Sequence, residues 1–207
     1  MASNDILELM IATLALAIIA PAVQQEQIAP LVSGTGDYSL AVSNLEAGAQ
    51  PYFDQGLRLM YGYHFPEAIA SFREAQRRDP DCAMPYFGEA LAIAPNPNSR
   101  LNGMEDDPAR AGRIAIEKAL VFIDGANQLE KDLITTLADY YKSGEPNRIR
   151  DRKYVDSLHE LHGRYPTDDD VATIFAGAIM VTSPWNYWSP DGKPRPLMLD
   201  ALEALQE

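Results

Sequence analysis

Two histidines three residues apart are the clearest candidates for chemistry in this sequence. His159 and His162 fall on one face of a helix expected over about 148–163, and imidazole is a common ligand of zinc. Two imidazoles do not make a metal site, so a third ligand would have to come from His64 or from the acidic run at 168–170. A surface pair is the simpler interpretation, and we predict no metal and no cofactor.

The acidic run at 168–170 opens another expected helix. Carboxylates in a first turn offset the positive end of the helix dipole, whereas calcium needs alternating oxygen ligands that 168–171 do not supply. The sequence also lacks a glycine-rich phosphate loop, a G-x-S-x-G serine motif and an H-E-x-x-H zinc-protease motif. We therefore predict that the protein is not an enzyme.

Three aromatic residues gather in a loop near the end of the sequence: Trp185, Tyr187 and Trp188. Each can bury about 150–250 Å² of surface, so we expect something to cover them. Packing against neighbouring helices is one interpretation, and a partner anchored by Trp185 and Trp188 is the other. An enzyme or metal-dependent module that uses His159, His162 and this loop is the alternative function.

Five residues at fixed spacing predict the elements that position these side chains: Gly56, Ala68, Phe72, Ala75 and Pro80. The absence of a side chain at Gly56 lets a first helix approach a second closely. The small side chains of Ala68 and Ala75 allow the same close approach, and the Phe72 ring fills the space between the helices. Pro80 ends the second helix because proline has no N–H to donate. The spacing is that of one repeat of two antiparallel helices.

Three segments extend this pattern, over 49–59, 67–75 and 79–84. They resemble the tetratricopeptide repeat (TPR) family, and in particular a group of bacterial TPR proteins that are mostly exported. The resemblance runs from about Leu31 to the end, including the loop around Trp185. It implies an all-α fold, a right-handed superhelical stack of antiparallel helix pairs known as an α-solenoid, and it brings no catalytic residues.

The repeat domain is expected over 44–207, with Asn44 capping a first helix that starts at Leu45. Residues 23–43 are rich in Gln, Gly, Ser and Ala and predict a linker or extended lead-in. Within the domain we expect a best repeat at 49–82, a second repeat from 83 with an insertion at 95–106, a degenerate pair at 127–163 and an incomplete pair at 167–207.

TPR arrays commonly bind peptides in a concave groove lined by the first helix of each pair. The resemblance places these groove residues in this chain: Phe53, Leu57, Met60, Tyr61, Phe87, Leu91, Thr173 and Met180. Nearly all are apolar, and a clamp for a C-terminal carboxylate would need Lys, Arg and Asn instead. We therefore predict a protein–protein interaction scaffold that holds an apolar peptide or partner surface.

The start of the sequence predicts export. Residues 9–20 are apolar, and small residues at Ala20 and Ala22 suit cleavage of a signal peptide at 1–22, which implies a periplasmic or extracellular protein. Asp5 and Glu8 stand where a signal carries Lys or Arg, so an uncleaved anchor and an N-terminal core helix remain alternatives.

The net charge excludes two classes of partner. Seventeen Lys+Arg against thirty Asp+Glu give a net charge of −13, which disfavours nucleic acid and anionic membranes as partners.

The last helix carries Met198, Leu202 and Leu205 on one stripe with no polar outer face, so we expect further repeats beyond it. The single cysteine, Cys82, allows no intrachain disulfide, and a small buried residue is favoured over a reactive thiol.

Overall fold

The computed structural model describes residues 26–99 and 107–206, and this part of the chain is all-helical. The predicted signal peptide and residues 100–106 of the predicted insertion lie outside the described residues. The described helices are α2 (Gln50–Tyr61), α3 (Phe65–Arg78), α4 (Ala83–Ile93), α5 (Pro108–Val121), a 3-10 turn (Ile123–Gly125), α6 (Gln128–Lys142), α7 (Asn147–Arg164), α8 (Asp169–Thr182) and α9 (Pro196–Ala204).

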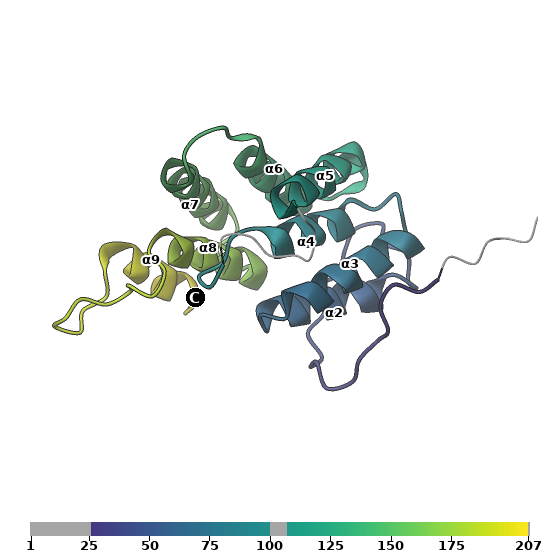
Figure 1. The fold of residues 1–207 in the computed structure, drawn as a ribbon, viewed down its shortest axis with the longest axis horizontal. Helices are drawn as coiled ribbons and strands as arrows, with labels where there is room; N and C mark the ends of the chain where they lie inside the picture. Colours follow the sequence, from purple (N-terminus) through teal and green to yellow (C-terminus); the bar gives the residue numbers. More distant parts are fainter. Residues whose placement is uncertain (1–25, 100–106, 207) are drawn as a thin grey trace, which may run out of the picture.

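Each helix packs on the next one along the chain, from α2 through to α9. The central α4 also contacts α2 and α6, which lie two helices away in either direction. Figure 1 shows α4 near the middle of the molecule, with α2 and α3 on one side of it and α7 to α9 on another. Short turns at 62–64 and 79–82 keep the first three helices together, so their apolar faces form one continuous core.

Phe72 of α3 holds the first three helices together. Its ring is fully buried, and a Cβ placed on Gly56 of α2 or on Gly88 of α4 would lie 2.6 Å or 2.5 Å from it. The ring also packs against Phe53, with the two ring centres 5.6 Å apart. The predicted contact between Gly56 and Phe72 is therefore confirmed, and Gly88 supplies a second glycine that the repeat spacing did not indicate.

A tyrosine plays a similar part between α5 and α6. A Cβ on Gly112 would lie 2.6 Å from the ring of Tyr141, and the Tyr141 hydroxyl donates a 2.8 Å hydrogen bond to the carbonyl of Ala90. The phenol thus fills a helix contact and pairs with a main-chain carbonyl of α4 at the same time. Burial raises its pKa well above the usual value, so the hydroxyl stays a donor.

Residues 26–46 contain no helix and turn at 33–35 and at 43–44, and we call this segment the N-terminal strap. The predicted helix start at Leu45 is wrong, because α2 begins at Gln50 and Asn44 has a positive φ of 56°. The Asn44 amide instead donates to the carbonyl of Gly125, far along the sequence. A tertiary contact therefore overrides the local capping signal.

Capping residues set the later helix starts. Asp107 accepts from the Arg110 N–H at 3.0 Å, and Asn127 and Glu130 form a reciprocal capping box. At α8 the cap is Asp168, which accepts from the Val171 N–H at 2.9 Å.

Candidate functional site

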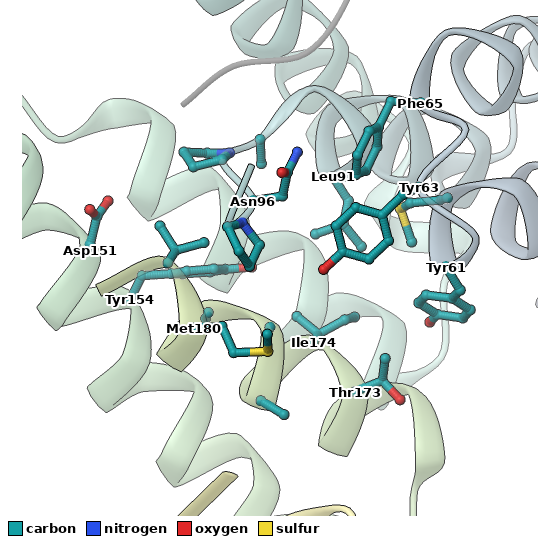
Figure 2. Close-up of a pocket in the computed structure, with 18 of the residues that line it drawn as sticks. Tyr61, Tyr63, Phe65, Leu91, Asn96, Asp151, Tyr154, Thr173, Ile174 and Met180 are labelled. Atoms are coloured by element: carbon teal, nitrogen blue, oxygen red, sulfur yellow. The ribbon is translucent and has the colours of Figure 1, made fainter. Parts of the chain in front are cut away.

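An apolar pocket of about 270 Å³ lies where the carboxyl ends of α2 and α4 face α8 (Figure 2). Its walls come from α2, α3, α4, α6, α7 and α8, the turns after α2 and α4, and Leu205. The residues that line it are Met60, Tyr61, Tyr63, Phe65, Leu91, Ala94, Pro95, Asn96, Pro97, Tyr140, Asp151, Tyr154, Thr173, Ile174, Ala176, Gly177, Ala178, Met180, Val181 and Leu205.

Helix spacing and one turn direct side chains into this pocket. Ile174 and Met180 stand on α8, and Figure 2 shows them facing the same space as Tyr63. Tyr63 follows the end of α2 with a φ of 65°, which turns the chain sharply. Its ring packs edge-on against Phe65 at 5.4 Å between ring centres. The wall therefore combines residues that are distant in sequence.

The wall formed by α6 and α7 carries the one carboxylate among the lining residues, that of Asp151. The Tyr140 hydroxyl donates to the Asp151 carboxylate at 3.2 Å, and the Arg150 guanidinium lies 4.6 Å above the centre of the Tyr140 ring. Burial raises the pKa of Tyr154, so its hydroxyl remains protonated. These contacts give the wall fixed, mostly aromatic surfaces with one carboxylate among them.

A buried carboxylate lies beside the pocket. Asp170, in the first turn of α8, is 6% exposed and accepts hydrogen bonds from the hydroxyls of Tyr61 and Tyr38. Burial raises the pKa of Asp170, while the two tyrosine hydroxyls act in the opposite direction. Tyr38 belongs to the N-terminal strap and Tyr61 to α2, so one carboxylate joins the strap and α2 to α8.

The structure places the predicted groove residues in two different environments. Met60, Tyr61 and Leu91 line the pocket, together with Thr173 and Met180. Three others lie in the hydrophobic core, with exposed fractions of 0% to 3%, and have no free surface for a partner: Phe53, Leu57 and Phe87.

The two tryptophans lie outside the pocket. Trp185 is 76% exposed and Trp188 is 52% exposed. We expected both side chains to be covered, but the described residues leave them largely open to solvent. Trp185 adopts a positive φ of 61°, and the loop closes through a bridge between Trp188 and Pro194. The tertiary structure therefore separates these residues from Met60 and Leu91.

The histidine pair packs on an aromatic ring. The imidazoles of His159 and His162 lie 5.6 Å and 5.7 Å from the ring centre of Phe175, with similar tilts. Within 26–99 and 107–206, no group of three or more His, Cys, Asp or Glu side chains could hold a metal ion. The pair thus joins α7 to α8 by side-chain packing.

Cys82 is a buried free thiol, 5% exposed. Burial raises its pKa to about 11, which keeps it protonated and weakly nucleophilic at neutral pH. In the part of the chain that the structure describes, no helix has the length and apolar character needed to cross a membrane.

Sequence reasoning missed several residues of the pocket. Ile174 and Tyr154 line it but were not predicted, because Ile174 lies between two predicted positions on α8 and Tyr154 lies on α7. Pro95 and Pro97 offered the best signal, because a rigid turn directly after α4 places small apolar surfaces at its carboxyl end.

The comparisons with known proteins return no match: no family model, no curated protein and no solved structure is similar to this chain.

Proposed function

We propose that this protein is an interaction scaffold, and that the pocket between α2, α4 and α8 receives an apolar segment of a partner protein. The proposal keeps the interpretation of the helices as TPR-like pairs stacked in a right-handed superhelix, with the pocket on the side formed by first helices. The observation that carries it is the pocket itself, whose lining is predominantly apolar and aromatic.

The volume of the pocket and the net charge of the chain indicate what kind of partner segment would bind. A volume of about 270 Å³ is near the lower limit of small-molecule sites, so it suits one or two side chains better than a cofactor. The chain carries a net charge of −13, and Asp151 lies in the wall. Charge complementarity therefore favours an apolar residue flanked by Lys or Arg.

Labelled ten-residue peptides with a central Leu-Phe pair test this function. One set has flanking lysines and a matched set has flanking glutamates, and binding to the full chain is followed by fluorescence anisotropy. We expect the lysine set to bind more tightly, and Met180→Asp to weaken that binding at least tenfold, about 1.4 kcal/mol. The control Val121→Asp changes a side chain that is 73% exposed on α5 and should bind like the wild type.

Two results would contradict the proposal. One is that neither peptide set binds a chain whose circular dichroism is helical. The other is that Met180→Asp remains folded and binds as tightly as Val121→Asp, since a carboxylate buried beside the apolar ligand must weaken a real complex.

A further inference from the structure

A second cleft lies away from the apolar pocket, along α4 between α3 and α5. The helix α4 packs against both of these helices, and Figure 1 shows it between them. Tyr86 and Glu89 line the cleft from one face of α4, whereas Leu91 lines the apolar pocket from another face. The cleft holds about 510 Å³, which is within the size range of small-molecule sites. We call it the α3–α5 cleft.

Helix spacing brings three cationic side chains to the α3–α5 cleft. Arg73 and Arg77 stand one turn apart on α3, and Lys118 stands on α5. The whole chain has a net charge of −13, yet the only carboxylate among the residues that line this cleft is that of Glu89. The cleft is therefore a positive region on an acidic protein, and its charge complements an anion.

Buried carboxylates hold the two arginines in place. Glu89 is 7% exposed and accepts a hydrogen bond from Arg73 at 2.7 Å. Arg77 donates from Nε and Nη2 to Glu74 at 2.9 Å and 2.7 Å, and Arg78 donates to the same carboxylate. One negative charge thus faces two guanidinium groups. A guanidinium has more N–H groups than this pairing uses, so Arg77 keeps donors for a bound anion.

The Lys118 ammonium has no ion-pair partner among the residues that the structure describes. It lies 5.4 Å from the centre of the Tyr86 ring, whose π-electrons attract a cation without using its N–H donors. The ring itself is fixed, because its hydroxyl donates to the carbonyl of Pro80 at 3.0 Å and it stacks on Phe122. Lys118 therefore offers a positive charge and N–H donors at the cleft.

Two exposed isoleucines line the same cleft. Ile114 of α5 is 45% exposed, and Ile28, whose N–H is bound by Glu74, is 49% exposed. A hydrocarbon group in the cleft would cover both side chains and remove their apolar surface from water. Inorganic phosphate would pair with the cations and leave the isoleucines uncovered. The lining thus fits an anion that also carries an aliphatic group.

We propose that the α3–α5 cleft binds a small organic acid, with its carboxylate among Arg73, Arg77 and Lys118 and its aliphatic chain against Ile28 and Ile114. A guanidinium matches the planar geometry of a carboxylate, and an ammonium adds a compact charge. A few polar groups beside apolar ones, in a cleft of this volume, are the usual composition of a small-molecule site. The inference is separate from the proposed function, because among the described residues no side chain lines both sites.

Octanoate is the probe, and NMR of the full chain with labelled isoleucine methyl groups locates it. We expect saturable shifts of the Ile28 and Ile114 signals, while Ile174 of the apolar pocket stays unchanged. Calorimetry then compares octanoate with octanol, which keeps the chain but lacks the charge, and with phosphate, which is charged but has no chain. Each should bind about tenfold more weakly than octanoate, since each lacks one of the two contacts.

Two pairs of variants separate the charge from the apolar contact. Lys118→Gln should weaken octanoate binding about tenfold, whereas Lys142→Gln removes the same charge from an exposed position on α6 and should bind like the wild type. Ile114→Asn should weaken binding about fivefold, and Val121→Asn, on the exposed side of the same helix, should not. All four positions are exposed, so circular dichroism should remain that of the wild type.

Several results would overturn the proposal. One is that octanoate shifts neither Ile28 nor Ile114 of the helical wild type, or shifts Ile174 alone, a result that needs no variant. Others are that octanol or phosphate binds as tightly as octanoate, or that Lys118→Gln and Lys142→Gln bind it equally well. An acetylated Leu-Glu-Leu peptide that binds more tightly than octanoate would make a protein segment the occupant and overturn the assignment to a small acid.

Discussion

The contact between the N-terminal strap and α2 differs in kind from the apolar pocket. On α2, the buried side chains of Asp54 and Gln55 accept hydrogen bonds from main-chain N–H groups of the strap. The pocket is lined mainly by apolar and aromatic groups, and no part of residues 26–46 lines it. Tyr61 connects the two regions, since it lines the pocket and its hydroxyl shares Asp170 with Tyr38 of the strap.

The difference shows that one helix can take part in two kinds of contact. Polar side chains of α2 hold the backbone of the strap, whereas the pocket is walled mainly by apolar and aromatic side chains. Each of the following changes tests one of these two regions separately from the other.

The largest effect is expected at Phe72, whose ring packs between α2 and α4. Phe72→Ala removes the ring between Gly56 of α2 and Gly88 of α4, and both helices also line the pocket. We expect the free energy of unfolding to fall by about 3–5 kcal/mol in urea denaturation. Phe72→Leu retains most of the volume and should lose clearly less. Equal losses for the two variants would show that the ring is not tightly packed.

Glu74→Ala should loosen the start of the N-terminal strap and spare the pocket. The carboxylate pairs with Arg77 at 2.7 Å and Arg78 at 2.7 Å and accepts the Ile28 N–H. Both arginines are partly exposed and can return to water, so we expect a loss of about 2–3 kcal/mol in unfolding free energy. The control Asp156→Ala breaks an exposed pair with Arg152 and should cost less than about 1 kcal/mol. Hydrogen exchange should show faster opening at Ile28 only in the Glu74 variant.

The same carboxylate predicts a pH dependence. Hydrogen bonds from Arg77 lower the pKa of Glu74 to about 2, below its ordinary 4.5. A lowered pKa adds stability that is complete above about 4.5 and is lost as the pH falls toward 2. Unfolding of the wild type and Glu74→Gln at pH 6 and pH 2.5 should therefore differ more at pH 6. A constant difference between the two proteins would contradict the assigned pairing.

Tyr61→Phe should weaken the contact at Asp170 that joins the strap and α2 to α8. The variant keeps the ring in the pocket and removes one donor from Asp170. A hydrogen bond to a charged group contributes about 1.5–3 kcal/mol, and part of this is recovered because Tyr38 remains, so we expect a loss of about 1–2 kcal/mol at pH 7. The loss should shrink at pH 3, where Asp170, whose pKa is raised, is protonated. Tyr63→Phe, at an exposed pocket residue, is the matched control.

The smallest effect is expected at Trp185, which neither lines the pocket nor contacts the strap through any described hydrogen bond. Its side chain is 76% exposed and its backbone has a positive φ. Trp185→Ala should change the free energy of unfolding by less than about 0.5 kcal/mol and leave peptide binding to the pocket unchanged. A larger loss of binding would show that the loop contributes to the partner site after all.

Local patterns predicted the first helices well and the binding surfaces only in part. Gly56, Phe72 and Pro80 lie within one pair of helices or directly after it, where spacing along the chain dictates which side chains meet. The resemblance to TPR proteins placed Met60 and Leu91 in a groove, and both line the pocket. It could not separate them from Phe53, Leu57 and Phe87, because a helix face does not reveal which of its turns another segment covers.

The strap was the feature hardest to predict from residues alone. Its Gly, Ser and Gln content is typical of a linker, and its order comes from side chains of helices that follow it, such as Gln55 and Glu130. Asn44 carried a capping signal that a contact with Gly125 overrode. The aromatic loop at Trp185 was expected to be covered, and the structure leaves both tryptophans exposed.

By itself the sequence determined an all-helical fold, because apolar periodicity, small residues at helix contacts and helix-ending prolines act over a few turns of chain. Only the tertiary structure decided which surfaces stay open. It sets the buried polar groups of α2 against the strap backbone and leaves an apolar space between α2, α4 and α8. Both depend on contacts between residues distant in sequence, whose free energies no local pattern contains.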